Sequence, residues 1–321
     1  MIAGETATRA GGRYAALGVF AAALAVYVAT VVVAGRTATP QYSYYDRLAA
    51  ALLRGELHIG LVTPDDVAAG FAPVEAAAPA EWLTAPGADV GPPERNDLTP
   101  HGGRWYVPFP PAPALLLAPL VALRGVEGVS TPLVSAVLLV FLTLQAAAAR
   151  GLLATRWRDH VWLAAMFAVG SVFWVVATDG TVWFLAHVTT VLGLALAAWL
   201  AVRTGNAWLS GAALAVAVAS RPHVLLVWPL LYGLARARAR PALPDAGARR
   251  RHLWRWALAS GAPLALVCGG LAAYNQARFG SPLDFGYLAQ NVAPSVKADL
   301  LGHGQFHPRF VPRNLWTMLG M

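Results

Sequence analysis

The residues best suited to chemistry form a short polar stretch directly after the first long apolar run. Residues 42–48 read Tyr-Ser-Tyr-Tyr-Asp-Arg-Leu and place one carboxylate, Asp46, beside an arginine and three tyrosines. A carboxylate can accept a proton from a hydroxyl group that comes within hydrogen-bond reach. An Asp-Arg pair is also typical of a helix N-terminus or a surface ion pair, so both interpretations stay open.

Basic side chains beside apolar segments form a second group of candidates. They are Arg104, Arg221, Arg278 and, two residues after Arg221, His223. Arginine binds phosphate through paired hydrogen bonds, so a phosphate-bearing lipid substrate would explain these charges. Anionic lipid headgroups, toward which Arg221 could extend its side chain, would explain them as well.

Two other polar features have a simpler explanation. Asp179 precedes Gly180, and Asp-Gly commonly forms a turn, although the carboxylate could also contact a substrate. His303 and His307 have the spacing of two metal ligands on one helical face, but Pro308 and two neighbouring glycines disfavour a helix there. We therefore assign no cofactor and no metal, since a divalent metal has no supporting motif.

The composition indicates which scaffold must position these side chains. Of the 321 residues, 57% are hydrophobic and 12% are charged, against about 25% charged in an average soluble domain. We expect an all-α polytopic membrane protein with about seven transmembrane helices. The apolar runs that predict them are 14–34, 131–149, 160–178, 182–202, 207–220, 222–234 and 256–276.

Arginines between these runs indicate the orientation. Two arginines precede the first run, and seven occupy residues 235–255. The positive-inside rule makes the N-terminus and 235–255 cytoplasmic in the plasma membrane. Residues 36–107 then form a long outer loop and 278–321 an outer segment of one transmembrane domain. The net charge of +8 thus reports orientation, and we expect no nucleic-acid partner.

Three segments have patterns of their own. Apolar residues at 48, 52, 53 and 57 predict a short amphipathic helix over 46–57 on the outer surface. Residues 63–100 are rich in Pro, Ala and acidic side chains and predict an irregular loop. Residues 109–123 are apolar but contain four prolines, and they are too short to cross, so we expect a re-entrant or juxtamembrane segment that lines a cavity.

One ambiguity concerns the number of crossings. Runs 207–220 and 222–234 are each short and could be one helix broken at Pro222. The basic segment 235–255 favours two crossings, because a single helix would place that segment outside.

Five stretches together resemble the integral-membrane glycosyltransferases of the GT-C superfamily, in the branch related to protein mannosyltransferases and aminoarabinose transferases. This chain departs from their pattern where Arg47 follows Asp46 instead of a second acidic residue, and where Phe109 replaces a common histidine. Such relatives usually continue with more helices, so we expect 278–321 to lead into a helix beyond this sequence. The stretches are 45–57, 106–113, 180–184, 220–222 and 274–282.

The resemblance implies an inverting transfer of a sugar from a polyprenyl-phosphate donor to a hydroxyl or amine on the outer face. The acceptor would be a glycan, a lipid or a protein. Asp46 corresponds to the general base. The resemblance implies phosphate or substrate contacts for Arg221, Arg278, Arg104, His223, Asp179 and Tyr45.

Two alternatives stay open. A non-catalytic protein, such as a lipid or glycolipid transporter or a scaffold, would carry charged residues within opposed helices and an internal repeat. A ligase that moves a whole glycan from a lipid carrier would share the topology.

Overall fold

The computed structural model describes residues 2–38, 42–86, 88–90, 94–135, 157–304 and 307–320. Helices make up 69% of the structure and strands 3%, which confirms the helical class. The α-helices are α1 (Ile2–Val33), α2 (Tyr45–Leu53), α3 (Pro64–Ala68), α4 (Ala80–Leu83), α5 (Ala112–Arg124), α7 (Trp157–Val169), α8 (Phe173–Asp179), α9 (Val182–Trp199), α10 (Ala207–Val218), α11 (Trp228–Ala242), α12 (Ala246–Phe279), α13 (Pro294–His303) and α14 (Phe310–Leu319). The strands are β1 (Thr99–His101) and β2 (Arg104–Tyr106).

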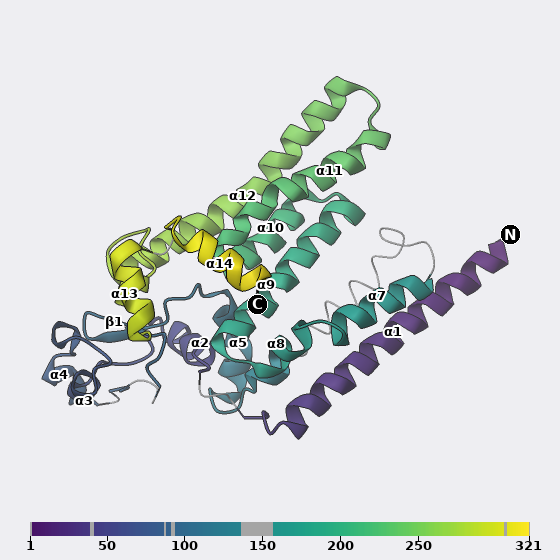
Figure 1. Ribbon diagram of the computed structural model, residues 1–321. Helices are drawn as coiled ribbons and strands as arrows, with labels where there is room; N and C mark the ends of the chain where they lie inside the picture. The colour runs from purple at the N-terminus through teal and green to yellow at the C-terminus, as the bar shows by residue number, and fades with distance from the viewer. Residues whose placement is uncertain are drawn as a thin grey trace. The chain divides into compact units, whose positions relative to one another are not determined.

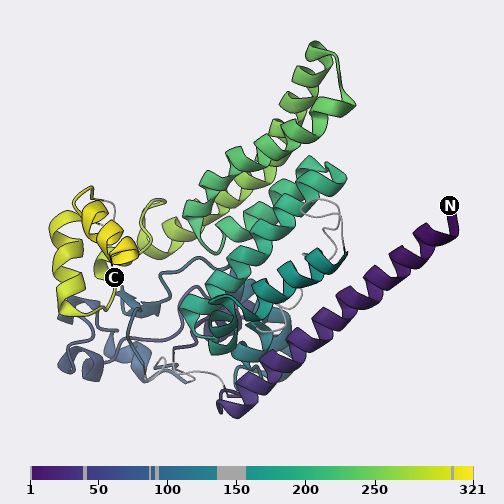
Figure 2. The ribbon, with the colours of Figure 1, turned by 45° about the vertical axis from the view of Figure 1, so that its right-hand side comes forward.

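The chain groups into two compact units, which are described separately. The first consists of Met1–Gly55 and Phe109–Tyr274, and the second of Glu56–Pro108 and Asn275–Met321. The first holds most of the long helices, and Figures 1 and 2 show α9, α10, α11 and the first part of α12 side by side.

In the part of the chain that the structure describes, two helices are long and apolar enough to cross a membrane. They are Val182–Thr204, in which a π-helical turn extends α9, and α12. Helices α7 and α8 would supply a third span if they act as one, although they meet at a bend of 53°. These helices support a membrane protein with two to three spans. Most of the predicted run 131–149 lies outside the described residues.

Small residues bring the helices of the first unit close together. A Cβ on Gly193 would lie 2.7 Å from the carbonyl oxygen of Ala213, and one on Gly211 would lie 2.1 Å from that of Ser260. Helix backbones approach in this way where a residue has no side chain. The apolar core of α9, α10, α11 and α12 forms around these contacts and includes Leu214, Leu231 and Trp256.

The chain reverses between α10 and α11, which resolves the ambiguity at Pro222. Arg221 adopts an extended backbone, and a 3-10 helix (Pro222–Val227) follows it. Near the far end of α11, Arg238 donates hydrogen bonds to the carbonyl oxygens of Val202 and Arg203, at 2.6 and 3.1 Å. Those residues lie just before α10 begins, so α11 runs back along α10. The two runs are separate antiparallel helices rather than one broken helix.

Three predicted boundaries need correction. The expected loop 235–255 is largely helical, because α11 continues to Ala242 and α12 begins at Ala246. The predicted helix 46–57 exists as α2 but ends at Leu53, with Gly55 in a left-handed conformation beyond it (φ +77°). Its face also differs from the prediction, because Leu48 is buried whereas Leu53 is 52% exposed.

The Pro-rich segment forms a single short helix. Helix α5 has 13 residues, begins just after Pro111 and contains Pro119 in its interior. This is well short of the roughly 20 residues that a crossing requires, which agrees with the expectation that the segment does not span. Within the first unit, α5 packs against α2.

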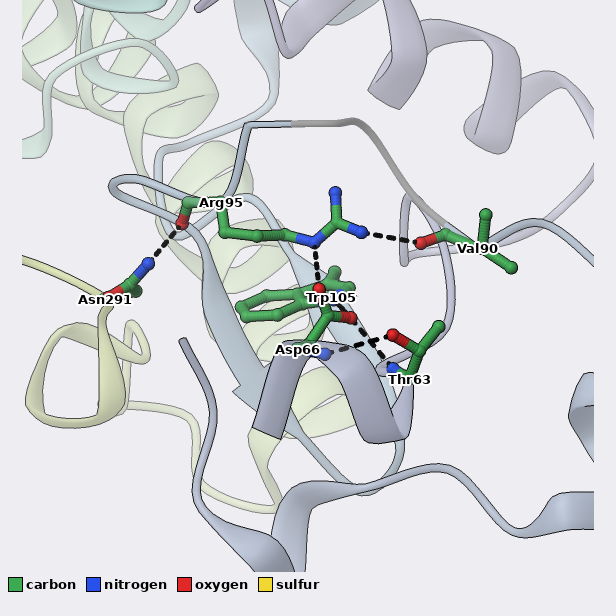
Figure 3. Close-up of polar contacts among 6 residues, drawn as sticks. All are labelled: Thr63, Asp66, Val90, Arg95, Trp105 and Asn291. Atoms are coloured by element: carbon green, nitrogen blue, oxygen red, sulfur yellow. Dashed lines mark hydrogen bonds and ion pairs between the residues drawn. The ribbon is translucent and has the colours of Figure 1, made fainter. Parts of the chain in front are cut away.

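The expected irregular loop at 63–100 contains short helices, among them α3 and α4, and a buried carboxylate organises it in the second unit (Figure 3). Asp66 accepts hydrogen bonds from Arg95 Nε at 2.8 Å, Trp105 Nε1 at 3.1 Å and the Thr63 N–H at 2.8 Å. Thr63 caps α3 in return through its hydroxyl. Burial raises the pKa of Asp66, but these hydrogen bonds and the Arg95 charge outweigh it and lower the pKa.

Segments distant in sequence complete the second unit. Strands β1 and β2 form an antiparallel hairpin with Thr99 opposite Tyr106. The Thr99 hydroxyl donates to the carbonyl oxygen of Gly286, and Asn291 pairs through its backbone with Asp97 and Leu98. Residues after α12 are thereby held against the hairpin region.

We expect Gly211→Ala to destabilise the first unit by about 1 to 3 kcal/mol, because the new methyl group must displace the Ser260 backbone. Gly233→Ala is the matched control, since a Cβ there meets nothing within 4 Å. Thermal unfolding of the detergent-purified protein measures both. Equal midpoints for the two variants would contradict the close helix contact.

We expect Asp66→Asn to destabilise the second unit by about 3 to 5 kcal/mol, because it leaves the buried Arg95 charge uncompensated. Asp65→Asn, at an exposed neighbouring carboxylate, should have little effect. Because the folded pKa of Asp66 is lowered, its contribution is present above an unfolded value of about 4 and is lost as pH falls through the folded pKa. Hydrogen exchange of residues 56–108 as a function of pH tests this prediction.

Candidate functional site

Asp46 lies in the first turn of α2 and is almost completely enclosed. Asp46 is only 1% exposed to solvent. Oδ1 accepts the Arg47 N–H at 2.8 Å, whereas Oδ2 is buried and has no hydrogen-bond partner among the described residues. Tyr44, at the N-cap, makes no side-chain capping hydrogen bond. One carboxylate oxygen is therefore enclosed by protein and is not paired within the described part of the chain.

Burial is the main influence on the titration of this carboxylate. It raises the pKa of Asp46 to about 6, against the lowering effects of the Arg47 N–H, the Arg47 charge and the Ser43 hydroxyl. A carboxylic acid with that pKa is ionised at neutral pH and can take up a proton with little cost. Arg47 is the charged side chain that acts on this pKa.

The segment before α2 attaches Asp46 to the start of α9. The carbonyl oxygen of Tyr42 accepts the Val182 N–H at 3.0 Å, and the Tyr42 ring lies 5.4 Å from that of Trp183, centroid to centroid. The Ser43 hydroxyl donates to Thr131 Oγ1 at 3.4 Å. The polar stretch singled out from the sequence thus lies at the N-terminal end of α9.

Arg221 belongs to the same end of the first unit. Its Nη2 donates to the Trp183 carbonyl oxygen at 3.1 Å and lies 3.5 Å from His187 Nε2. Its Nε is buried and has no acceptor among the described residues, and the described ion pairs do not include Arg221. The guanidinium is half-buried, and no carboxylate of the described residues balances its charge. His223, two residues further on, is exposed.

Helix α5 also begins at this end. The Ala112 N–H donates to the Ala219 carbonyl oxygen at 3.0 Å, just before Arg221. Since α5 packs on α2, the Pro-rich segment connects the helix that carries Asp46 to the turn that carries Arg221.

Asp179 forms the turn expected of an Asp-Gly pair. Its Oδ1 accepts the Thr181 N–H at 3.2 Å, and its Oδ2 lies 3.6 Å from Arg36 Nη1. Gly180 adopts φ +74°, and a Cβ there would lie 2.4 Å from the Pro132 nitrogen. In the structure, the Asp179 carboxylate therefore stabilises a turn and forms an ion pair with Arg36. Tyr45 is fully buried within α2.

Arg278 and Arg104 belong to the second unit, where both serve its packing. Arg278 is 3% exposed and donates to the Val107 carbonyl oxygen at 2.6 Å and to Asn275 Oδ1 at 2.8 Å. The Arg104 guanidinium lies 4.9 Å from the centre of the Trp82 ring. These contacts attach α12 and β2 to their surroundings.

Sequence reasoning missed the partners of the candidate residues. Trp183 and His187 are four residues apart and so share a face of α9, but no pattern relates them to Arg221. Arg36 likewise has no sequence signal as the partner of Asp179. Among the described residues, no group of three His, Cys, Asp or Glu side chains is placed to hold a metal.

We expect Asp46 to make stability depend on pH in a defined direction. A raised pKa means that the folded state binds the proton more readily, so the stabilising contribution is full below about pH 4 and is lost as pH rises through about 6. A shift of about two units corresponds to about 3 kcal/mol. Asp46→Asn should therefore unfold at a higher temperature than the parent at pH 8 and should flatten the pH dependence between 4 and 6. A parent whose midpoint does not change over that range would contradict the buried carboxylate.

No protein-family model, curated protein or solved structure matches this chain significantly. The comparisons therefore add no family to the observations above.

Proposed function

We propose that this protein is a membrane glycosyltransferase that uses a polyprenyl-phosphate sugar as donor. The observation that carries the proposal is the buried Oδ2 of Asp46, an acceptor without a partner among the described residues, on a carboxylate whose pKa is raised to about 6. A general base needs a free lone pair and a pKa close to the working pH.

In this proposal the acceptor hydroxyl or amine gives its proton to Asp46 Oδ2. The acceptor atom forms a bond to the anomeric carbon, and the bond from that carbon to the phosphate oxygen breaks with inversion. The polyprenyl phosphate leaves as an anion. Because Asp46 is only 1% exposed, the residues that cover α2 must move to admit the acceptor.

Arg221 is the group best placed to bind the phosphate. It lies at the same end of the first unit as residues 42–46, through Trp183, and has no carboxylate partner among the described side chains. A fixed cation that is not neutralised stabilises a developing phosphate anion. His187, whose Nε2 lies 3.5 Å from the guanidinium, can accept one of its N–H groups and so orient it. His223, Asp179 and Tyr45 complete the proposed substrate contacts.

The proposal also requires a topology. About seven crossings in the plasma membrane, with a cytoplasmic N-terminus, place the Asp46 end of the helices outside. This topology is supported by the grouping of the start of α9, the end of α10 and α2 at one end of the first unit. Arg238 lies at the other end of these helices with the carbonyl groups of residues 202 and 203. The acceptor is a glycan, a lipid or a protein.

Asp46→Asn tests the base directly. With membranes that contain the protein and a radiolabelled polyprenyl-phosphate sugar, the variant should lose about 100- to 10,000-fold in transfer rate. In the parent, kcat/KM should rise with pH through about 6 as Asp46 ionises. Asp65→Asn, an exposed carboxylate of the second unit, is the matched control and should keep full activity.

Undiminished sugar transfer by Asp46→Asn would contradict the assignment of Asp46 as the general base. A parent protein that moves the labelled lipid across a bilayer but transfers no sugar would favour a transporter. Arg221→Gln should raise KM for the lipid-linked donor more than KM for the acceptor.

A further inference from the structure

The last turns of α11 and the first turns of α12 form a strongly basic surface. This surface lies at the end of the first unit opposite Asp46. Exposed arginines cover both helices there, and Asp245 in the connecting turn is the one acidic residue in 200–260. None of these arginines forms an ion pair with a carboxylate in the described part of the chain. The arginines are Arg236, Arg238, Arg240, Arg250, Arg251 and Arg255.

A cavity of about 310 Å³ opens within this surface, between the end of α9 and helices α11 and α12. Alanines 235, 239 and 242 with Leu243 give it an apolar wall. Arg238 and His252 supply its polar side. The cavity therefore combines space for hydrocarbon with basic groups for an anion.

Two polar groups of the cavity differ in their hydrogen bonding. Arg238 is held by the carbonyl oxygens of Val202 and Arg203 at the end of α9. Trp256 lines the cavity and is 3% exposed, yet its indole Nε1–H has no acceptor among the described residues. Buried indole N–H groups usually find a partner, so this donor points to a ligand.

The position along the helices identifies the kind of ligand. Trp254 is 65% exposed and stands with the arginines at the beginning of α12, where the apolar part of the helix starts. Tryptophan and arginine gather at the boundary between headgroups and hydrocarbon, and basic pockets between helices bind anionic lipid headgroups. A free phosphate ion has no hydrocarbon part that could pack against the alanine wall.

We propose that this cavity binds an anionic glycerophospholipid, with its phosphate beside Arg238, His252 and the Trp256 N–H and an acyl chain along the alanines of α11. The site is separate from the one proposed for Asp46 and does not depend on sugar transfer.

Binding can be measured by native mass spectrometry of the detergent-purified protein titrated with phosphatidylglycerol or phosphatidylcholine. We expect phosphatidylglycerol to bind more tightly. Ala242→Phe should fill the cavity and abolish this binding, whereas Ala237→Phe, at an exposed position on the same helix outside the cavity, should leave it unchanged. Arg238→Gln should weaken it about fivefold, and Arg236→Gln, which removes an equal charge outside the cavity, should not.

Three results would overturn the proposal. They are equal binding of the two lipids, equal loss in Ala242→Phe and Ala237→Phe, and equal loss in the two arginine variants. Inorganic phosphate tests the source of the anion: if it raises the thermal midpoint of the lipid-free protein as much as phosphatidylglycerol does, the site takes a free ion rather than a lipid. Ala242→Phe keeps the test valid if Arg238→Gln fails to fold, because it leaves the hydrogen bonds of Arg238 intact.

Discussion

The backbones of α9 and α10 approach closely because Gly193 has no side chain at their contact. A Cβ there would lie 2.7 Å from the Ala213 carbonyl oxygen, and the equivalent clash at Gly211 would involve Ser260 on α12. Lipid tails are as apolar as leucine, so helices in a membrane associate through close packing rather than through exclusion of water. These contacts fix how α9, α10 and α12 lie beside one another, and both proposed sites depend on that alignment.

The alignment gives the two ends of the helices different chemistry. At one end, Trp183 on α9 contacts both Tyr42 and Arg221. These contacts place a buried carboxylate and the Arg221 guanidinium at the same end of the first unit. At the other end, Arg238 stabilises the last carbonyl groups of α9 and its π-helical turn, where the helix dipole favours a cation. The same packing thus positions the site proposed for sugar transfer at one end and the cavity proposed for a lipid at the other.

The second unit is held by polar contacts instead. Its centre is the Asp66 carboxylate, which Arg95, Trp105 and the backbone of Thr63 surround (Figure 3). A buried ion pair is costly to form, but removing one partner is costlier still, since the other charge is left without compensation. Residues 63–100 read as a loop because their prolines and acidic side chains carry no periodic apolar pattern. Their order comes from contacts with β2 and with residues near Asn291, which no local pattern can show.

The sequence by itself determined the helical class and the apolar runs that became α9 and α12, because hydrophobicity over about 20 residues is a local property. It also placed the Asp46 carboxylate at the start of a short helix, and it placed Pro111 and Gly125 at the two ends of α5. Only the tertiary structure decided that Asp46 is buried, that α10 and α11 run antiparallel, and that Arg221 lies beside His187 whereas Arg278 bonds to Val107. Burial and charge balance depend on which distant segments meet, and the close packing at Gly193 and Gly211 decides that for the first unit.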